Sequence, residues 1–422
     1  MFAMSLFLVL TILAASQASP IQLVPRTIRL PSSTDPFYQP PPSYSDLPPG
    51  TILRHRIVDP PPTINASISV AHQVLYRSTD SQNIPNAVVT TVLIPASAQH
   101  GKLFSFQLAY DSPFVDCSPS YELYTNDTHS EVPLIAAALN EGWAVSYPDY
   151  EGPTAAFTNG IQSGQAVLDS LRALLSSSDM TGLGPDTTYT LAGASGGSLA
   201  SLWALELLPS YAPELNVSGA LLTATVPNII SALRTIDGTI YAGLIPSGLL
   251  GLAKQYPVIS EWLSVHLRSN VSEMFVEVGQ RCIDENLVVY ANHSFSDFFN
   301  VDGAWEEGVQ DYTFDPLLGG VAREASDSGY RGTPSTPMFI FKGVLDELSP
   351  VADTDELVNK YCEVGAGKIS IEYQRALNAD HSAGGMVGFT AGWGWLRNRM
   401  NGVVVEGGCT VSNVTLRAQE DV

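Results

Sequence analysis

The sequence predicts an α/β fold with a mostly parallel sheet that is covered by helices on both faces. Short β-rich apolar runs alternate with helical patterns from about residue 103 onward. The 422 residues, 45% of them apolar, suffice for a large buried core. Residues 227–330 contain helical segments and little strand character, so we expect a helical cap insertion between two halves of the sheet.

The first 18 residues, MFAMSLFLVLTILAASQA, are typical of a signal peptide. The mostly apolar run from Leu6 to Ala15 is too short to span a bilayer, and Ser16 and Ala18 fit a small-x-small cleavage site. The segment before this run lacks Lys and Arg, which is unusual for such a peptide. A buried N-terminal strand or helix is the alternative. The pattern predicts a secreted, extracellular protein.

Two further features are compatible with secretion. Four cysteines are an even number, and none of them has the CxxC spacing of a zinc or thioredoxin-like site. They allow three disulfide connectivities, and spacing alone does not choose among them. Six N-x-S/T sequons are glycosylation candidates, at Asn65, Asn126, Asn216, Asn270, Asn292 and Asn413.

The formal net charge of −22 disfavours binding to nucleic acid and to anionic lipid. No later apolar stretch is long enough to be a transmembrane segment. Charge and hydropathy therefore favour a soluble protein outside the cell, and they do not specify a reaction.

The expected organisation has four parts. Residues 19–50 are rich in Pro, Ser and Tyr and predict an extended arm laid over a domain surface, with ordered structure beginning near Leu53. Residues 51–226 and 331–422 would form the catalytic domain, with 227–330 as the cap.

Within the catalytic domain, alternating segments at 67–80 and 86–97 predict a pair of strands joined by a turn. The expected strands and helices that follow are strands at 103–110, 143–149, 187–195, 217–226, 336–343 and 368–374, and helices at 164–175, 196–208 and 382–400.

The motif Gly193-Ala194-Ser195-Gly196-Gly197 fits G-x-S-x-G. The strand expected before it and the helix after it are the context of a nucleophile elbow, in which glycines allow a strained turn to lift the serine above the sheet. A structural tight turn is the alternative. This context predicts an α/β-hydrolase fold with Ser195 as its nucleophile.

An acyl-transfer serine needs a histidine base and an acid that orients it, which in this fold follow in the order acid, then histidine. Of seven His residues, only His381 follows the second half of the sheet, and we expect the other six to be solvated loop residues. Asp346 follows the FIFKG strand and is the best acid, with the adjacent Glu347 as the alternative.

The oxyanion of the tetrahedral intermediate needs two N–H donors. One donor is expected to be the N–H of Gly196, which follows the nucleophile. The other should come from a loop after an earlier strand, and Asp111 at the end of LFSFQLAY is placed for this role. An ordinary turn aspartate is the alternative.

The chain resembles the fungal secretory lipase family from about Leu53 to Cys409. The motifs that carry the resemblance are YDSPFVDCSPSY (110–121), SYPDYEG (146–152), GASGG (193–197), SYAPELNVSGA (210–220), VLDELSP (344–350) and ADHSAG (379–384). The family pattern usually has an aromatic residue before the serine, where this sequence has Ala194. That difference is expected to change the pocket near the acyl chain and to leave the mechanism unaltered.

The resemblance implies a triad of Ser195, Asp346 and His381, an oxyanion hole from Asp111 and Gly196, and a helical cap over the site. It also favours two disulfides, Cys117–Cys282 and Cys362–Cys409. The implied reaction is two-step acyl transfer that needs no metal or organic cofactor.

The first choice of substrate is an acylglycerol or another long-chain ester, which brings the enzyme to a lipid–water interface. The alternative is a narrower carboxylesterase that removes short acyl groups from a small molecule, because the family includes fungal esterases that deacetylate trichothecenes. A peptidase is disfavoured because such enzymes usually carry an extra domain. A catalytically inactive binding protein of this fold is disfavoured because every catalytic role has a candidate residue.

Overall fold

The computed structural model describes residues 29–125, 129–300, 316–365 and 367–417. The proposed signal peptide (1–18) and the beginning of the arm lie outside these residues, as does Asn126. The described part of the arm is not extended throughout, and its order begins earlier than Leu53. It forms two 3-10 helices, η1 (Pro36–Tyr38) and η2 (Tyr44–Asp46). Aromatic side chains of both pack on strands of the sheet.

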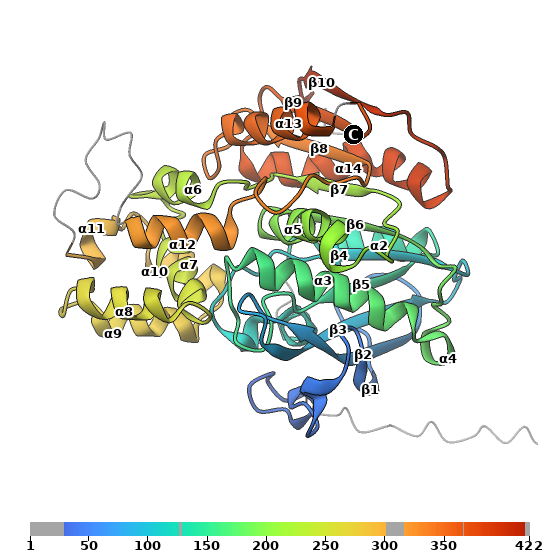
Figure 1. Ribbon diagram of the computed structural model, residues 1–422, viewed down its shortest axis with the longest axis horizontal. Coiled ribbons are helices and arrows are strands. Elements are labelled where there is room, and N and C mark those ends of the chain that lie inside the picture. Colours follow the sequence, from blue (N-terminus) through green and yellow to red (C-terminus); the bar gives the residue numbers. More distant parts are fainter. Residues whose placement is uncertain (1–28, 126–128, 301–315, 366, 418–422) are drawn as a thin grey trace, which may run out of the picture.

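Ten strands of the described chain form one sheet, in the order β1-β2-β3-β5-β4-β6-β7-β8-β9-β10 (Figure 1). Their bounds are β1 Ile52–Val58, β2 Ile68–Thr79, β3 Pro85–Pro95, β4 Lys102–Gln107, β5 Ala144–Pro148, β6 Thr188–Ala194, β7 Ala220–Thr223, β8 Met338–Gly343, β9 Ser370–Ala376 and β10 Gly408–Val414. The strands from β5 to β10 in this order are parallel to their neighbours, and β1, β2 and β3 join antiparallel. The mostly parallel sheet is therefore confirmed, and the sequence did not predict the two edge strands, β1 and β10.

Helices cover both faces of this sheet. In the catalytic part they are α1 Pro119–Glu122, α2 Val132–Asn140, α3 Gly160–Leu175, α4 Ser178–Thr181, α5 Gly196–Tyr211, α13 Val351–Gly365 and α14 His381–Met400. Alternate residues of a strand point to opposite faces. Leu221 and Phe339 accordingly join a core cluster with α2 and α14, whereas Leu222 and Ile340 join a second cluster with α3, α5 and α13.

The segment between β7 and β8 is helical and lies beyond one end of the sheet (Figure 1). Its helices are α6 Ile229–Ile236, α7 Leu244–Ala253, α8 Pro257–His266, α9 Ser272–Glu277, η4 Val278–Gln280, α10 Ile283–Val289, α11 Phe295–Phe298 and α12 Pro316–Ser326. We call this segment the cap. None of the helices in the described part of the chain is both long and apolar enough to cross a membrane.

Two disulfides link distant segments, and they are the pairs that the resemblance favoured. Cys117–Cys282 joins η3 (Val115–Cys117), in the loop after β4, to the start of α10 in the cap. Cys362–Cys409 joins α13 to the edge strand β10. Five sequon asparagines, Asn65, Asn216, Asn270, Asn292 and Asn413, are exposed.

Candidate active site

Ser195 stands at the junction of β6 and α5 in a strained backbone conformation. Its φ of 51° and ψ of −120° are rare for a residue with a side chain, and such strain is typical of functional positions. Glycine is required two residues before Ser195, because a Cβ on Gly193 would lie 2.3 Å from the carbonyl oxygen of Gly197. This sharp turn holds the serine at the carboxyl end of the central strands.

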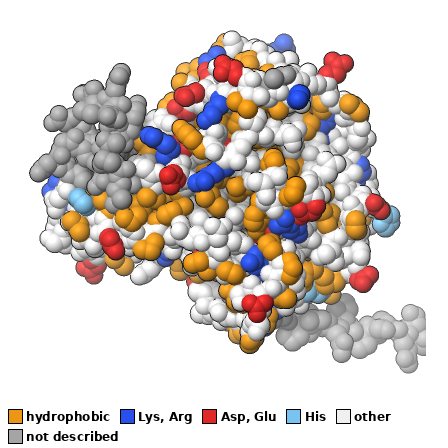
Figure 2. Space-filling model, in the orientation of Figure 1, with side chains coloured by type: hydrophobic (Ala, Val, Ile, Leu, Met, Phe, Trp, Pro, Cys, Tyr) orange, Lys and Arg blue, Asp and Glu red, His pale blue; other side chains and the backbone are white. Residues whose placement is uncertain are grey.

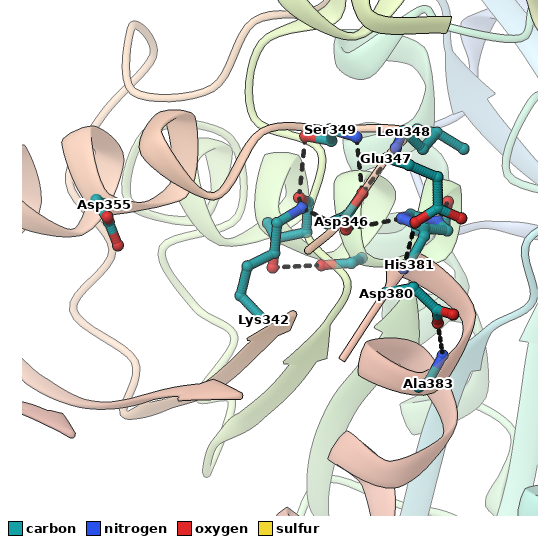
Figure 3. A network of polar contacts seen from close by, with 12 residues as sticks. Lys342, Asp346, Glu347, Leu348, Ser349, Asp355, Asp380, His381 and Ala383 are labelled. Atoms are coloured by element: carbon teal, nitrogen blue, oxygen red, sulfur yellow. Dashed lines mark hydrogen bonds and ion pairs between the residues drawn. The ribbon is translucent and has the colours of Figure 1, made fainter. Parts of the chain in front are cut away.

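The imidazole of His381 lies between Ser195 and Asp346. Its Nε2 is 3.0 Å from Ser195 Oγ, and its Nδ1 is 2.9 Å from Asp346 Oδ2. His381 begins α14, where Asp380 caps the helix by accepting a hydrogen bond from the N–H of Ala383 at 2.8 Å (Figure 3). The three predicted residues, which are far apart in the sequence, therefore meet in one hydrogen-bonded line.

The carboxylate of Asp346 is fully buried and has a hydrogen bond at each oxygen. Oδ1 accepts from the N–H groups of Leu348 and Ser349, and Oδ2 accepts from Lys342 Nζ at 2.8 Å (Figure 3). Burial alone would raise the pKa of Asp346, but the hydrogen bond from His381 and the charge of Lys342 lower it to about 2. Asp346 is therefore ionised over the working range of most enzymes.

The side chain of Glu347, the alternative acid, does not form a hydrogen bond with the imidazole of His381. Its Oε2 accepts a hydrogen bond from the backbone N–H of His381 at 3.0 Å, and its Oε1 accepts from the hydroxyl of Tyr241 at 2.8 Å. Glu347 thus fixes the backbone that carries the imidazole and contacts the cap, whereas Asp346 contacts the imidazole itself.

Asp111 and Gly196 face each other beside Ser195. Asp111 has a left-handed φ of 41°, and a Cβ on Gly196 would lie 1.8 Å from Asp111 Oδ1. Gly196 begins α5, where the first N–H groups have no preceding helical turn to bond and the helix dipole favours negative charge. Burial raises the pKa of Asp111 to about 6, and its Oδ1 has no hydrogen-bond partner among the described residues.

Two more buried carboxyl groups lie near this loop, and the sequence did not single them out. Glu131 Oε2 accepts a hydrogen bond from the N–H of Ala109 at 2.9 Å, and burial raises the pKa of Glu131 to about 8. Glu151 is fully buried, and burial raises its pKa well above the ordinary value. Glu131 is therefore mostly protonated at neutral pH, and burial favours the protonated form of Glu151.

Two cavities meet at Ser195. The first, which we call the wide cavity, has a volume of about 420 Å³ and is lined by polar and apolar residues. Its lining residues are Ala109, Tyr110, Glu122, His129, Ser130, Glu131, Ala194, Ser195, Ala224, Ile283, Asp284, His381, Ser382, Gly385 and Met386.

The second cavity, which we call the narrow slot, has a volume of about 40 Å³ and runs under the cap helices α6 and α7. Its lining is largely apolar and comprises Asp111, Phe157, Thr158, Ser195, Gly196, Leu199, Val226, Ile229, Ala232, Leu233, Ile236, Leu244 and Leu348.

The expectation that the remaining histidines are solvated loop residues is wrong for some of them. His72 is buried within β2, and its Nδ1 lies 2.7 Å from Nε2 of His55 on β1. His129 lines the wide cavity. His72 lies within 67–80, which the sequence itself predicts to be a strand, so the loop expectation was inconsistent with that prediction. The antiparallel pairing of β1 with β2 places His55 near His72. Among the described residues, no group of three or more His, Cys, Asp or Glu side chains is arranged to hold a metal ion.

Comparison with known proteins agrees with this geometry. The family model described as secretory lipase matches residues 119–408. The chain belongs to the secretory lipase family. It is similar to Lipase A of Arthroderma benhamiae, with 40% identity over 403 residues that cover 91% of this chain and 83% of that protein. It is also similar to the trichothecene C-3 esterase of Fusarium sporotrichioides, with 37% identity covering 92% of this chain and 88% of that protein.

Among solved structures, Candida antarctica lipase A in its closed state has a TM-score of 0.81 to this chain. The identity is 28%, and the match covers 91% of this chain and 90% of that one. The chain has the α/β-hydrolase fold, and it is a carboxylic ester hydrolase of the secretory lipase family. These comparisons confirm the predicted fold, the resemblance and the class of reaction.

Proposed function

We propose that this secretory lipase hydrolyses carboxylic esters through an acyl-enzyme on Ser195, with His381 as the base and Asp346 as the acid that orients it. The observation that carries the proposal is the contact of one imidazole with both partners, at 3.0 Å from Ser195 Oγ and 2.9 Å from Asp346 Oδ2. A nucleophile, a base and an orienting acid in hydrogen-bonded sequence are the geometric signature of this chemistry.

In the first half-reaction, His381 Nε2 accepts the proton of Ser195 Oγ as the oxygen attacks the ester carbonyl carbon. The ionised Asp346 stabilises the imidazolium that forms. The carbonyl oxygen becomes an oxyanion, which accepts hydrogen bonds from the N–H groups of Gly196 and Asp111. The bond to the alcohol oxygen then breaks, and His381 gives its proton to that oxygen, which leaves an acyl group on Ser195.

In the second half-reaction, a water molecule gives a proton to His381 and attacks the acyl carbon. The second tetrahedral intermediate collapses as the proton returns from His381 to Ser195 Oγ. The products are the free carboxylic acid and the regenerated serine, so atoms and charge balance without a co-reactant other than water.

The lining of the two cavities indicates where the acyl part and the alcohol part of the ester bind. The leaving alcohol oxygen must face the group that protonates it, and His381 lines the wide cavity and not the narrow slot. The two proposed oxyanion donors, Asp111 and Gly196, line the narrow slot. We therefore assign the acyl chain to the narrow slot and the alcohol to the wide cavity.

The preferred substrate is an acylglycerol or another ester with a long acyl chain. The apolar lining of the narrow slot supports this choice, as do the lipase names of the related proteins. Figure 2 shows apolar side chains on the cap side of the visible face. On the cap helices, Val265, Val276 and Val288 are exposed. These side chains would favour contact with a lipid–water interface. The signal-like leader, the sequons and the disulfides support secretion of the enzyme.

The size of the narrow slot favours a second candidate. A volume of about 40 Å³ has room for only about three water molecules. Long chains therefore require α6 or α7 to move, whereas a short acyl group needs less movement. The wide cavity, about ten times larger, would hold a bulky alcohol. The second candidate is a short-acyl esterase that acts on a small molecule, as the name of the Fusarium relative describes for that protein.

A chain-length series separates the two candidates. We expect kcat/KM for p-nitrophenyl esters from two to sixteen carbons to rise by about fourfold per methylene until the slot is full, because each buried methylene contributes about 0.8 kcal/mol. The optimum is expected at eight carbons or longer, with release of fatty acid from emulsified triglyceride. A sharp preference for acetyl esters without attack on emulsions would instead establish the short-acyl esterase.

A further inference from the structure

The wall of the wide cavity is acidic. Glu122, Glu131 and Asp284 line it, and no Lys or Arg is found among the lining residues that the structure describes. Glu122 comes from α1, Glu131 precedes α2, and Asp284 belongs to α10 of the cap. Three separate segments thus bring carboxyl groups to the compartment that also holds His381 and Ser195.

Among the acidic residues of this wall, Glu131 is the one whose surroundings indicate a ligand. Its side chain is 6% exposed, so it is more than nine-tenths buried. Oε2 is engaged by the N–H of Ala109, but Oε1 has no hydrogen-bond partner among the described residues. A buried carboxyl oxygen without a partner is costly, and a hydroxyl group of a ligand would satisfy it.

The other two carboxyl groups differ from Glu131 in exposure. Asp284 is exposed and Glu122 is partly exposed. Among the described lining residues, His129 is the one further titratable ring besides His381 and Tyr110, and burial lowers its pKa, which keeps it uncharged at neutral pH. The described lining residues thus include acidic side chains and no Lys or Arg, so the formal charge of the cavity wall is negative.

We propose that the wide cavity is a specificity subsite for the alcohol part of the ester, which binds uncharged, hydroxyl-bearing alcohols at Glu131 and rejects anionic alcohols through Glu122 and Asp284. This inference rests on the proposed function, because it takes the alcohol to leave on the His381 side. Like charges brought together at an interface are unfavourable, and removing water from the cavity strengthens the repulsion.

The test uses butanoyl esters that share one acyl group and differ in the alcohol. The alcohols are 1-propanol, glycerol and 3-hydroxypropanoate, so that the series runs from apolar to hydroxyl-bearing to anionic. We expect kcat/KM at neutral pH and low salt to be highest for the glycerol ester and at least tenfold lower for the anionic ester than for the propyl ester. Equal kcat/KM for the propyl and anionic esters would overturn the proposal.

Variants assign the effect to the wall. In the double variant Glu122→Gln/Asp284→Asn, the ratio of kcat/KM for the anionic ester to that for the propyl ester should rise at least threefold. In Glu131→Gln, the advantage of the glycerol ester over the propyl ester should shrink. Asp186→Asn is the matched control, because Asp186 is exposed in the loop that leads to the amino end of β6, at the opposite edge of the sheet. A double variant with the wild-type ratio, or a control that changes the ratio equally, would overturn the role of the wall.

The same assays separate this inference from the proposed function. Ser195→Ala is measured on all three esters. If hydrolysis survives in that variant, the proposed function fails. If hydrolysis depends on Ser195 but ignores the charge of the alcohol, only the subsite inference fails.

Discussion

Lys342 and Asp346 form an ion pair with no solvent exposure behind His381, with Nζ 2.8 Å from Oδ2. The same Oδ2 accepts the hydrogen bond from His381 Nδ1 at 2.9 Å, and Lys342 Nζ also donates to the carbonyl oxygen of Thr225 at 2.8 Å. The lysine thus connects β8, the segment after β7 and the acid of the candidate triad. We infer that Lys342 is a positioning residue, which acts on the reaction through Asp346.

Lys342→Met tests this role. Removing one partner of a buried ion pair leaves the other charge uncompensated, so we expect the free energy of unfolding to fall by about 3 kcal/mol or more. The pKa of Asp346 should rise. Without the charge of Lys342, the Asp346 carboxylate also favours the protonated imidazole of His381, so the acid limb of kcat/KM against pH should move to higher pH. Urea unfolding and a pH–rate profile measure the two effects. Lys368→Met, which removes an exposed lysine, is the control. An acid limb that stays in place would contradict the positioning role.

The two adjacent acids are expected to differ in their effects on kcat. Asp346→Asn replaces the acceptor of the His381 hydrogen bond and should lower kcat by about 10³- to 10⁴-fold, as loss of the triad acid does elsewhere. Glu347→Gln keeps an acceptor oxygen for the backbone of His381 or for Tyr241, so its kcat should fall less than tenfold. Steady-state kinetics of both variants on one ester decide the assignment. A larger loss in Glu347→Gln would reverse it.

Stability is expected to decrease as pH rises above about 5. Burial raises the pKa of Asp111 to about 6, of Asp149 to about 7 and of Glu131 to about 8, each above the value in the unfolded chain. The folded state therefore holds more protons than the unfolded state in this range. The stability that these groups contribute is complete below their unfolded pKa values and is lost as pH rises through the folded ones.

The melting temperature measured from pH 4 to pH 9 tests this prediction. We expect it to fall between pH 5 and pH 8, and we expect Asp149→Asn to make that fall shallower, because one of the carboxyl groups with a raised pKa is removed. A melting temperature that increases from pH 5 to pH 8 would contradict the protonation states assigned to these carboxyl groups.

The acyl assignment predicts a change in chain-length preference. Leu233 on α6 is 6% exposed and lines the narrow slot. Leu233→Trp should fill the slot and lower kcat/KM for octanoyl and longer esters at least tenfold, while acetyl esters should lose less. Val265 on α8 is exposed on the outer cap surface, so Val265→Trp is the matched control. An equal loss for acetyl and octanoyl esters in Leu233→Trp would show that the acyl chain lies elsewhere.

The main elements of the fold and the candidate site could be predicted because local patterns encode them. The apolar runs before Ser195 and Asp346 are strands, and the glycines around Ser195 mark the strained turn. His381 could be predicted because, in this fold, the histidine follows the acid along the chain. These signals lie within short windows, where periodicity and turn chemistry are readable.

Other features depend on tertiary contacts that no local pattern contains. Lys342 reads as a polar residue at the end of a strand, and only the packing of β7 and β8 shows that it is buried against Asp346. The choice between Asp346 and Glu347 depends on which side chain faces the imidazole. The strand β10 is almost wholly exposed, so it lacks the apolar alternation that would predict it.

The most direct test of Ser195 as the nucleophile is labelling with a fluorophosphonate, followed by intact mass measurement and peptide mapping. We expect one adduct per molecule, located on Ser195, and loss of ester hydrolysis in proportion to labelling. The Ser195→Ala variant should fold normally but should be neither labelled nor active. Hydrolysis that persists in the fully labelled enzyme or in Ser195→Ala would contradict the assignment of Ser195 as the nucleophile.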